Sequence, residues 1–320
     1  MQLEQFLLKV QKLKIDRAHG NAPHKPILLL SILQAIDSNL IQDNKIYITP
    51  ELVSLFKSNW NALVITSHEC RFALPFYHLS GDGFWNLHPK AGYDNILSLK
   101  SAMRNFNQLN SAISYASFSD SLFEIFKEKG NYDIIKEIIL DTYFPKTKNN
   151  FSSFENKYFR DLENKLVNEP AEEYVREVKN LKLILTQESY AEEIFLRSGV
   201  FKREVPKIYN NTCCISGLRI DAKINISMID ACHIIPFSES YNDTITNGIA
   251  LCPNLHRAFD RGLIAIDNNY KVMVSNFFKE STSNYSICMF EGKQIILPQK
   301  QSNYPLMDNL EWHRINTFKV

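Results

Sequence analysis

The feature that most constrains this chain is a pattern of polar residues in the segment 230–260. A short β-branched run carries His233, and a loop rich in Ser, Asn, Asp and Thr leads from it to Asn247. Residues 252–254 then open a helix that holds His256. We therefore expect a strand, a loop and the start of a helix to bring two imidazoles and one carboxamide close together.

These residue types suit the hydrolysis of a phosphodiester bond. The reaction needs a base that takes a proton from water, and a cation that stabilises the phosphorane and the departing 3′ oxygen. Histidine has a reference pKa of about 6.5 and can act as this base near neutral pH, so we assign the role to His233. We expect His256 to bind the metal ion and Asn247 to orient the base or its neighbouring backbone.

The kind of metal ion and its second ligand follow from the nearby carboxylates. Open sites rich in oxygen favour Mg²⁺ or Mn²⁺ over metals that prefer soft ligands. Asp230 and Asp260 are the available carboxylates, and we choose Asp230 as the ligand, with Asp260 as the alternative. Taken singly, each histidine of the pattern fits a purely structural role. It is the joint spacing that indicates a metal-dependent site.

That spacing also resembles the pattern of a known family. Asn247 lies 14 residues after His233, and His256 lies 9 residues after Asn247. Ala-x-His-Ile-x-Pro surrounds the first histidine, and Phe-Asp-Arg-Gly-Leu follows the last. The stretch resembles the His-Asn-His (HNH) nucleases, which have the ββα-metal fold, and among them the modification-dependent, McrA-like restriction endonucleases. Members of the family usually carry an acidic metal ligand immediately before the base, where this chain has Cys232.

A second set of motifs lies in the first 90 residues. Ala-Pro-His-Lys-Pro at residues 22–26 precedes an apolar run over residues 27–33. We expect this run to form a buried helix with Pro26 in its first turn, where the missing N–H costs nothing. Two aromatic-rich segments, 72–79 and 84–87, flank a Gly-Asp-Gly turn and predict a β-hairpin.

These motifs, in this order and ahead of an HNH pattern, resemble the DNA-reading module of the same restriction enzymes, often called the sulfur-binding domain. In that family the module probes phosphorothioate-modified DNA. The resemblance implies phosphate contacts from basic residues and shape or apolar contacts from the hairpin. The residues at these positions are Arg17, His24 and Lys25 for the phosphates, and Pro75, Phe76, Tyr77 and His78 for the hairpin.

The resemblance of this module is partial, which leaves its target open. The chain has Leu74 where relatives commonly have Tyr, and Gly20-Asn21 where they have Arg. The candidate targets are therefore phosphorothioate DNA, a modified base or an unmodified sequence. The competing interpretation is a structural domain without a ligand of its own.

Composition limits how DNA could be bound. The 320 residues include 36 Lys and Arg against 35 Asp and Glu, a formal net charge of +1, so any DNA affinity must come from local basic patches. No apolar run approaches the roughly 20 residues of a membrane helix, and no secretory leader precedes the polar start. We expect a cytoplasmic protein without a membrane partner.

The cysteines argue against a disulfide framework and against a structural zinc ion. Six cysteines in a long chain are not typical of a disulfide scaffold. Some HNH proteins brace the fold with a zinc site made from two Cys-x-x-Cys pairs. Cys214 and Cys252 each lack the second thiolate of such a pair. Because a tetrahedral site needs four donors, we do not expect structural zinc.

Together the patterns predict an α+β protein in three parts. Residues 1–145 would form a mixed α/β DNA-recognition domain, residues 146–200 a linker with connector helices, and residues 201–320 a ββα-metal nuclease domain. Residues 98–143 are expected to be helical, and residues 263–274 to form a hairpin after the metal-binding helix.

The predicted function is a metal-dependent DNA endonuclease that serves as a restriction or phage-defence enzyme on modified double-stranded DNA. Such enzymes often act as homodimers, because two nicking centres are needed to cut both strands. The alternative is a non-catalytic DNA-binding protein that uses the nuclease fold as a scaffold. The complete His-Asn-His set favours the enzyme.

Overall fold

A computed structural model describes residues 2–17, 20–95, 105–152, 156–220, 227–281, 283 and 285–319. The chain folds into two compact units. Unit 1 contains Met1–Asp161 and Leu185–Leu196, and unit 2 contains Leu162–Ile184 and Arg197–Val320. The segment expected to be a connector, 146–200, is shared between these units, because helices α8 (Lys157–Asn168) and α10 (Gln187–Ile208) contribute residues to both.

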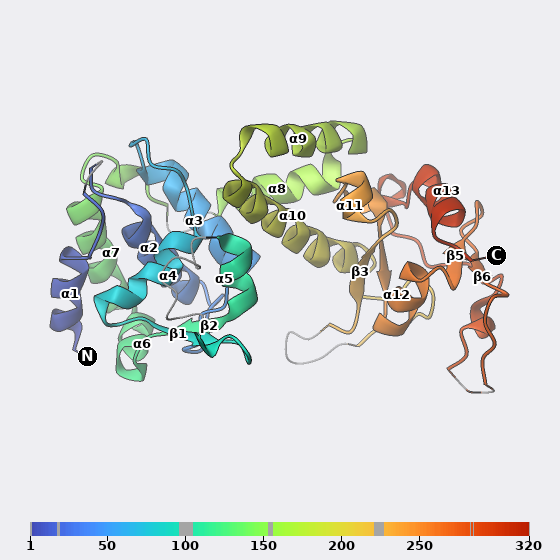
Figure 1. Cartoon of the computed structure of the whole chain (residues 1–320), viewed down its shortest axis with the longest axis horizontal. Helices are drawn as coiled ribbons and strands as arrows, with labels where there is room; N and C mark the ends of the chain where they lie inside the picture. The colour runs from blue at the N-terminus through green and yellow to red at the C-terminus, as the bar shows by residue number, and fades with distance from the viewer. Residues whose placement is uncertain are drawn as a thin grey trace. The chain divides into compact units, whose positions relative to one another are not determined.

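Unit 1 is built mainly from helices, with one short sheet at its edge (Figure 1). Its elements, besides its parts of α8 and α10, are α1 (Leu3–Gln11), α2 (His24–Asp37), α3 (Pro50–Leu63), α4 (Ala73–His78), β1 (Asn86–Pro89), α5 (Phe106–Ala112), β2 (Ile113–Ser117), α6 (Asp120–Lys127) and α7 (Lys129–Tyr143). Strands β1 and β2 are antiparallel, with Asn86 opposite Ser117.

Helix α2 is the centre of unit 1. Every residue from Lys25 to Ile36 is buried, and α3, α4, α6 and α7 all pack against the helix. The prediction of a buried helix over residues 27–33, with Pro26 in its first turn, is therefore confirmed. Its buried polar groups are satisfied internally, because the Asn59 amide donates to Ser31 Oγ at 3.0 Å and to Gln34 Oε1 at 3.1 Å.

The hairpin predicted over residues 72–87 is wrong. Its first half is helix α4, and β1 pairs with β2 rather than with residues 72–79. Phe72 and Phe76 are four residues apart and both fully buried, so they lie on one helical face, with ring centroids 5.5 Å apart. Glu192, far away in sequence, accepts hydrogen bonds from Phe72 N at 2.8 Å and Ala73 N at 3.4 Å and so satisfies the start of the helix.

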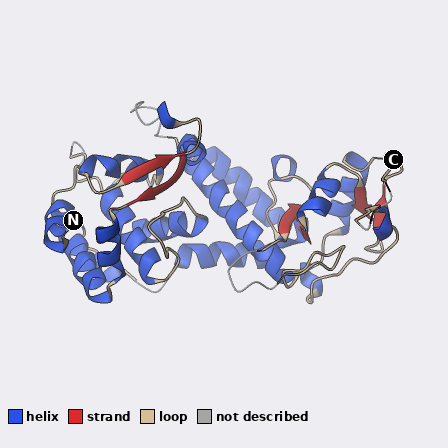
Figure 2. Ribbon diagram, turned by 90° about the horizontal axis from the view of Figure 1, so that it is seen from below, coloured by secondary structure: helices blue, strands red, loops and turns tan. Residues whose placement is uncertain are grey.

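The helical prediction for residues 98–143 holds for α5, α6 and α7 but fails at β2. Residues 98–104 of that prediction lie outside the described residues. Strand β2 forms because it pairs with β1 on one side and makes an isolated bridge from Ala116 to Ile46 on the other. The strands of the described chain are short pairs among helices (Figure 2).

Unit 2 carries the segment that the motif singles out. Its elements, besides its parts of α8 and α10, are α9 (Ala171–Ile184), β3 (Asp230–His233), α11 (Phe237–Ser240), β4 (Gly248–Leu251), α12 (Pro253–Asp260), β5 (Ile264–Ile266), β6 (Val272–Val274) and α13 (Met307–Asn316). The predicted strand, loop and helix are all present. β3 pairs antiparallel with β4, and α12 packs against both strands, as Figure 1 shows in orange.

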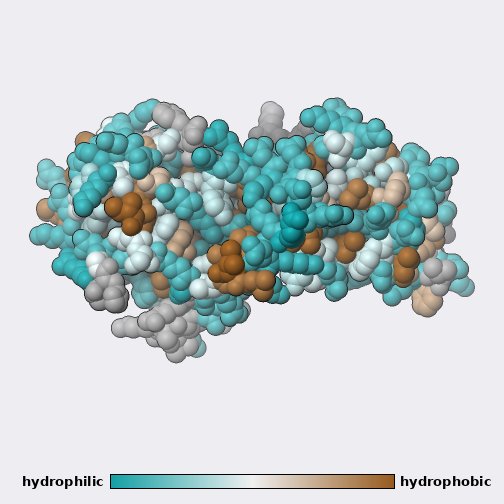
Figure 3. All heavy atoms as spheres, turned by 90° about the horizontal axis from the view of Figure 1, so that it is seen from above, coloured by the Kyte–Doolittle hydropathy of each residue, from teal (hydrophilic) through white to brown (hydrophobic). Residues whose placement is uncertain are grey.

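The second predicted hairpin is confirmed, because β5 and β6 pair antiparallel with Ile264 opposite Val274. Within the described residues, three two-stranded antiparallel sheets lie among the helices, so the α+β fold class is confirmed as well. On the face seen in Figure 3, hydrophobic residues appear as small separate patches on a largely hydrophilic surface. The described part of the chain contains no helix with the length and apolar character needed to span a bilayer.

Candidate functional site

Strand β3 sorts the motif residues onto two faces. Side chains alternate along a strand, so Asp230 and Cys232 share one face, and His233 belongs to the other. The contacts follow this division. Cys232 Sγ lies 3.7 Å from Asp260 Oδ1, and Asp230 Oδ2 lies 3.2 Å from His256 Nδ1, which joins the first face to helix α12.

His256 lies between two carboxylates on that face. Asp230 Oδ2 approaches its Nδ1 at 3.2 Å, and Asp260 Oδ2, one helical turn further along α12, approaches its Nε2 at 3.4 Å. The His256 side chain is 26% exposed, and the Asp230 and Asp260 side chains are 49% and 57% exposed. The helix runs from Pro253 to Asp260, and its position places both His256 and Asp260 beside β3.

This group of side chains fits a divalent cation. Among the described residues, Cys232, His256 and Asp260 each offer a ligand atom within 4.8 Å of the others. Burial, together with nearby Asp260, raises the pKa of Cys232 well above its usual value. Cys232 Sγ donates toward Asp260, and sulfur is a poor ligand for a hard cation such as Mg²⁺. The imidazole of His256 and one of the two carboxylates beside it then offer the nitrogen and oxygen donors that Mg²⁺ or Mn²⁺ accepts.

His233, the last residue of β3, lies in a different environment. Its ring stacks on Phe201 of α10 with a centroid distance of 3.8 Å and an interplanar angle of 7°. Its Nε2 lies 2.8 Å from Oδ1 of Asp243, and the side chains of His233 and Asp243 are 21% and 1% exposed. Asp243 could not be identified from the sequence. Its loop is rich in polar residues, and no periodic pattern distinguishes Asp243 from its neighbours.

Asn247 contacts the backbone that follows His233. Its Nδ2 donates to Ile235 O at 2.9 Å, and its Oδ1 accepts from Ile235 N at 3.0 Å. A further bond from Nδ2 to Asn242 O, at 3.0 Å, ties the loop to the same point. The side chain is fully buried. Its geometry therefore suits the second of the two roles predicted for it, which is holding the backbone next to the predicted base, His233.

Gly248 makes the close approach of α10 possible. It lies opposite His233 in the β3–β4 pair. A Cβ atom at this position would lie 2.7 Å from Val205 Cγ2 and 2.9 Å from the ring of Phe201. Any larger residue would push away the ring on which His233 stacks.

The residues predicted to contact DNA are in unit 1, where they are only partly brought together. A pocket of about 660 Å³ is lined by four of them, His24, Lys25, Pro75 and His78, and also by Lys14, Ile15, Asp16, Ala22, His68, Arg71, Leu74 and Gly81. Arg17 is exposed and does not line the pocket, whereas Phe76 and Tyr77 are buried in the core. The pocket has an apolar wall around Leu74 and Pro75.

Two residues predicted to contact phosphate, Lys25 and His24, form hydrogen bonds or ion pairs within the protein. Lys25 Nζ forms a largely buried ion pair with Asp82 at 2.6 Å and donates to Lys14 O at 2.7 Å. His24 Nε2 lies 2.9 Å from Glu69 O, and burial lowers the pKa of His24 below its ordinary value. At neutral pH, His24 is therefore uncharged, and a DNA backbone would meet little positive charge from either residue.

Arg71 and Lys14 are basic residues of this pocket that sequence reasoning missed. Arg71 Nη2 lies 2.6 Å from Glu69 Oε2, and the Arg71 and Glu69 side chains are 30% and 39% exposed. Arg71 lies two residues before the first residue of α4, so reading residues 72–79 as a strand hid its relation to Leu74 and His78. The helix places all three along one pocket.

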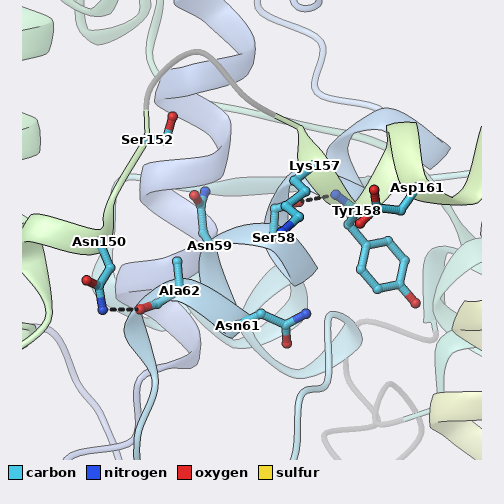
Figure 4. A pocket seen from close by; sticks show the side chains of 9 residues that line it. All are labelled: Ser58, Asn59, Asn61, Ala62, Asn150, Ser152, Lys157, Tyr158 and Asp161. Carbon is cyan, nitrogen blue, oxygen red and sulfur yellow. Dashed lines mark hydrogen bonds between the residues drawn. The ribbon is translucent and has the colours of Figure 1, made fainter.

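A second cavity of unit 1, of about 490 Å³, is lined mostly by polar side chains (Figure 4). Asn150 Nδ2 donates to Ala62 O at 3.3 Å at one end, and Ser58 Oγ accepts from Tyr158 N at 3.2 Å at the other. The first bond joins helix α3 to the segment before α8, and the second joins α3 to the start of α8. Some of the polar groups of this cavity are thus used in holding the chain together around it.

Comparison with known proteins agrees with the motif. Residues 213–267 match a family model described as HNH endonuclease, so the chain contains an HNH nuclease domain, and it is the domain that holds His233, Asn247 and His256. A search of the curated proteins gave no match.

Two solved structures are similar to parts of the chain. The first is the modification-dependent TagI restriction endonuclease, with 22% identity and a TM-score of 0.28 over 38% of this chain and 38% of that one. The second is the type IV phosphorothioation-dependent restriction endonuclease ScoMcrA, with 10% identity and a TM-score of 0.32 over 79% of this chain and 94% of that one. The chain thus spans less than half of TagI.

Proposed function

We propose that the protein is a metal-dependent DNA endonuclease that hydrolyses phosphodiester bonds in modified double-stranded DNA. The observation that carries this proposal is that the two histidines of the motif have different surroundings. One histidine, His233, is stacked and hydrogen-bonded as a base would be, and the other, His256, lies between two exposed carboxylates as a metal ligand would. Both belong to the segment that matches the HNH family model.

The chain's own residues can carry out the proton transfer. His233 takes a proton from a water molecule, and the resulting hydroxide oxygen forms a bond to phosphorus. The bond between phosphorus and the 3′ oxygen breaks, and that oxygen leaves with the electron pair and takes a proton from solvent. Asn247 fixes the backbone at Ile235 and so keeps the end of β3 in place during this step.

The metal ion would be held by His256 with Asp230 or Asp260. When bound, a divalent cation there supplies positive charge that stabilises the phosphate oxygens and the leaving oxygen. The mixed nitrogen and oxygen donors make Mg²⁺ or Mn²⁺ the proposed ions.

The pocket of unit 1 is the proposed DNA-reading site. It places the apolar surface of Leu74 and Pro75 beside Arg71 and His78. An apolar surface next to a cation suits a substituted phosphate or a modified base better than plain backbone, because an unmodified phosphate gains nothing from apolar contact. Reading by unit 1 and cutting by unit 2 would make a restriction or phage-defence enzyme in the cytoplasm.

A homodimer is part of the proposal, because one such centre cuts one strand. The competing function is DNA binding without catalysis. Burying the Asp243 carboxylate against His233 is costly. A catalytic role for His233 accounts for this cost, which favours the enzyme.

The experiment that tests the proposal is a cleavage assay on three DNA substrates. Plain, cytosine-modified and phosphorothioate DNA are incubated with the full-length protein and Mg²⁺ or Mn²⁺, with a chelator as control, and the cut sites are mapped. We expect cutting of at least one modified DNA, dependent on added metal and weaker on plain DNA. Binding of all three substrates with no cut strand under either metal would support the scaffold instead.

A further inference from the structure

Asp243 is an unusual residue for its position. Its side chain is 1% exposed, and its Oδ1 lies 2.8 Å from His233 Nε2. Its other oxygen, Oδ2, is buried and has no hydrogen-bond partner among the described residues. Burying a carboxylate with one oxygen unsatisfied is costly. A purely structural contact to the ring could be made by a neutral side chain at lower cost, so the charge itself points to a role in the reaction.

The loop around Asp243 is held firmly by the residues on either side. The Asn242 side chain accepts from Thr244 N at 2.8 Å and from Thr244 Oγ1 at 2.7 Å. Asn247 Nδ2 donates to Asn242 O at 3.0 Å, and Asn247 N donates to Thr244 O at 3.0 Å. The carboxylate is therefore fixed relative to the backbone that follows His233.

The ring of His233 has little freedom in this setting. Stacking on Phe201, at 3.8 Å and 7°, fixes the plane of the imidazole. An ionised carboxylate can only accept hydrogen bonds, so the nitrogen that faces Asp243 must carry the hydrogen. In the neutral imidazole the other nitrogen, Nδ1, then carries the lone pair.

We propose that Asp243 is a positioning residue that holds His233 in the tautomer protonated at Nε2, so that Nδ1 is the atom that accepts the proton of water. This inference rests on the proposed function of His233 as the base. As Nδ1 takes the proton and the hydroxide attacks phosphorus, the ring becomes an imidazolium. The charge of Asp243 at Nε2 stabilises that cation, as a buried carboxylate does for the base histidine of a catalytic triad.

The contrast with His256 supports the distinction between the two histidines. The carboxylates at His256 face both ring nitrogens and are about half exposed, so water or a cation can displace either. His233 has a single buried carboxylate at one nitrogen. One arrangement suits an exchangeable ligand, and the other suits a fixed proton acceptor.

The direct test is the tautomer of His233 in the wild-type protein without metal. Two-bond ¹H–¹⁵N correlation spectra of the full-length chain, recorded as pH is raised until the His233 signals stop changing, report which nitrogen carries the hydrogen. The His233→Gln variant assigns the signal by its loss. We expect hydrogen at Nε2, and hydrogen at Nδ1 would overturn the proposal. This measurement needs no cutting activity, so it separates the tautomer from the nuclease function.

A kinetic test follows with Asp243→Asn and the matched control Asp267→Asn. Asp267 accepts backbone hydrogen bonds in the β5–β6 turn of the same unit, away from His233. For Asp243→Asn we expect kcat for cutting to fall at least about 100-fold while KM for DNA changes less than about threefold. A fall in kcat of less than about tenfold, with the control unchanged, would contradict a positioning role. If Asp243→Asn does not fold, the wild-type tautomer still decides.

Discussion

Oδ2 of Asp230 on strand β3 lies 3.2 Å from Nδ1 of His256 on helix α12. This contact joins the strand that ends in the proposed base, His233, to the helix that would hold the metal. Asp260 approaches the opposite nitrogen of the same ring at 3.4 Å. Because a cation can take one ring nitrogen, one carboxylate would share the ion with His256 while the other orients the imidazole.

Replacing each carboxylate by its amide should separate these roles. Loss of an orienting carboxylate typically costs 10- to 100-fold in metal affinity, and loss of a direct ligand should cost more. We predict that Asp230→Asn raises the Kd for Mn²⁺ by more than about 100-fold, and Asp260→Asn by about 10- to 100-fold. Calorimetric titration of the DNA-free protein measures both, with Asp267→Asn as control. A larger rise in the Kd for Mn²⁺ in Asp260→Asn than in Asp230→Asn would identify Asp260 as the ligand.

His313 should make the nuclease unit sensitive to acid. Burial lowers the pKa of His313 to about 4, and its ring stacks on Phe259 of α12 with centroids 3.7 Å apart. In the unfolded chain the His313 imidazole binds a proton near pH 6.5, and in the folded chain it does so only near pH 4. The free energy of unfolding therefore falls as pH drops through this window. We predict that, as pH drops through this window, the free energy of unfolding of the wild type falls by up to about 3 kcal/mol more than that of His313→Gln. Chemical denaturation across the window checks this, and a pH-independent difference between the two proteins would refute it.

Gly262, two residues after the end of α12 in the Phe-Asp-Arg-Gly stretch, should tolerate no side chain. Its φ is +70°, and a Cβ there would lie 1.9 Å from Thr317 O. Gly217 has nearly the same φ, +72°, but open space around it. We predict that Gly217→Ala lowers the free energy of unfolding by about 1–2 kcal/mol, from backbone strain alone. Gly262→Ala should lower it by at least about 2 kcal/mol more, because the added Cβ also overlaps Thr317 O. Equal losses in a denaturant titration would show that the contact with Thr317 O is easily relieved.

The pocket of unit 1 should control the affinity for modified DNA. We predict that Arg71→Gln and His78→Ala, each made in a non-cutting His233→Ala background, weaken binding of the preferred modified duplex about tenfold, the loss expected for one charge-assisted contact. The exposed Lys127 pairs with Glu124 on α6 outside this pocket, and its replacement by Ala serves as control. Fluorescence anisotropy at fixed salt gives the Kd values. Unchanged affinity in both pocket variants would remove the pocket from DNA reading.

The parts of the fold that could be predicted from sequence are those set by local patterns. β3, its loop and α12 follow from a β-branched run, polar residues and a proline at a helix start. The buried α2 follows from an unbroken apolar run. Helix α4 could not be predicted in this way, because Phe72 and Phe76 fit either a strand or a helix. One contact that favours the helix comes from Glu192, which lies 120 residues from Phe72 in the sequence.

The candidate site shows the same limit. His233, Asn247 and His256 are recognisable because their spacing is fixed by short elements. The partner of His233 comes from an irregular loop, in which sequence gives no reason to choose Asp243 over its polar neighbours. In unit 1, Lys25 looks like a phosphate contact until its ion pair with Asp82 is seen, since the two are 57 residues apart.

The most direct measurement of the central claim is single-turnover nicking of plasmid DNA of the preferred modification by wild type and His233→Ala. Both are assayed with Mn²⁺ and with chelator, and DNA binding is measured in parallel. We predict that wild type nicks only with metal, and that the variant binds DNA as wild type does but shows no metal-dependent nicking. Nicking by His233→Ala at the wild-type rate would contradict the assignment of His233 as the base.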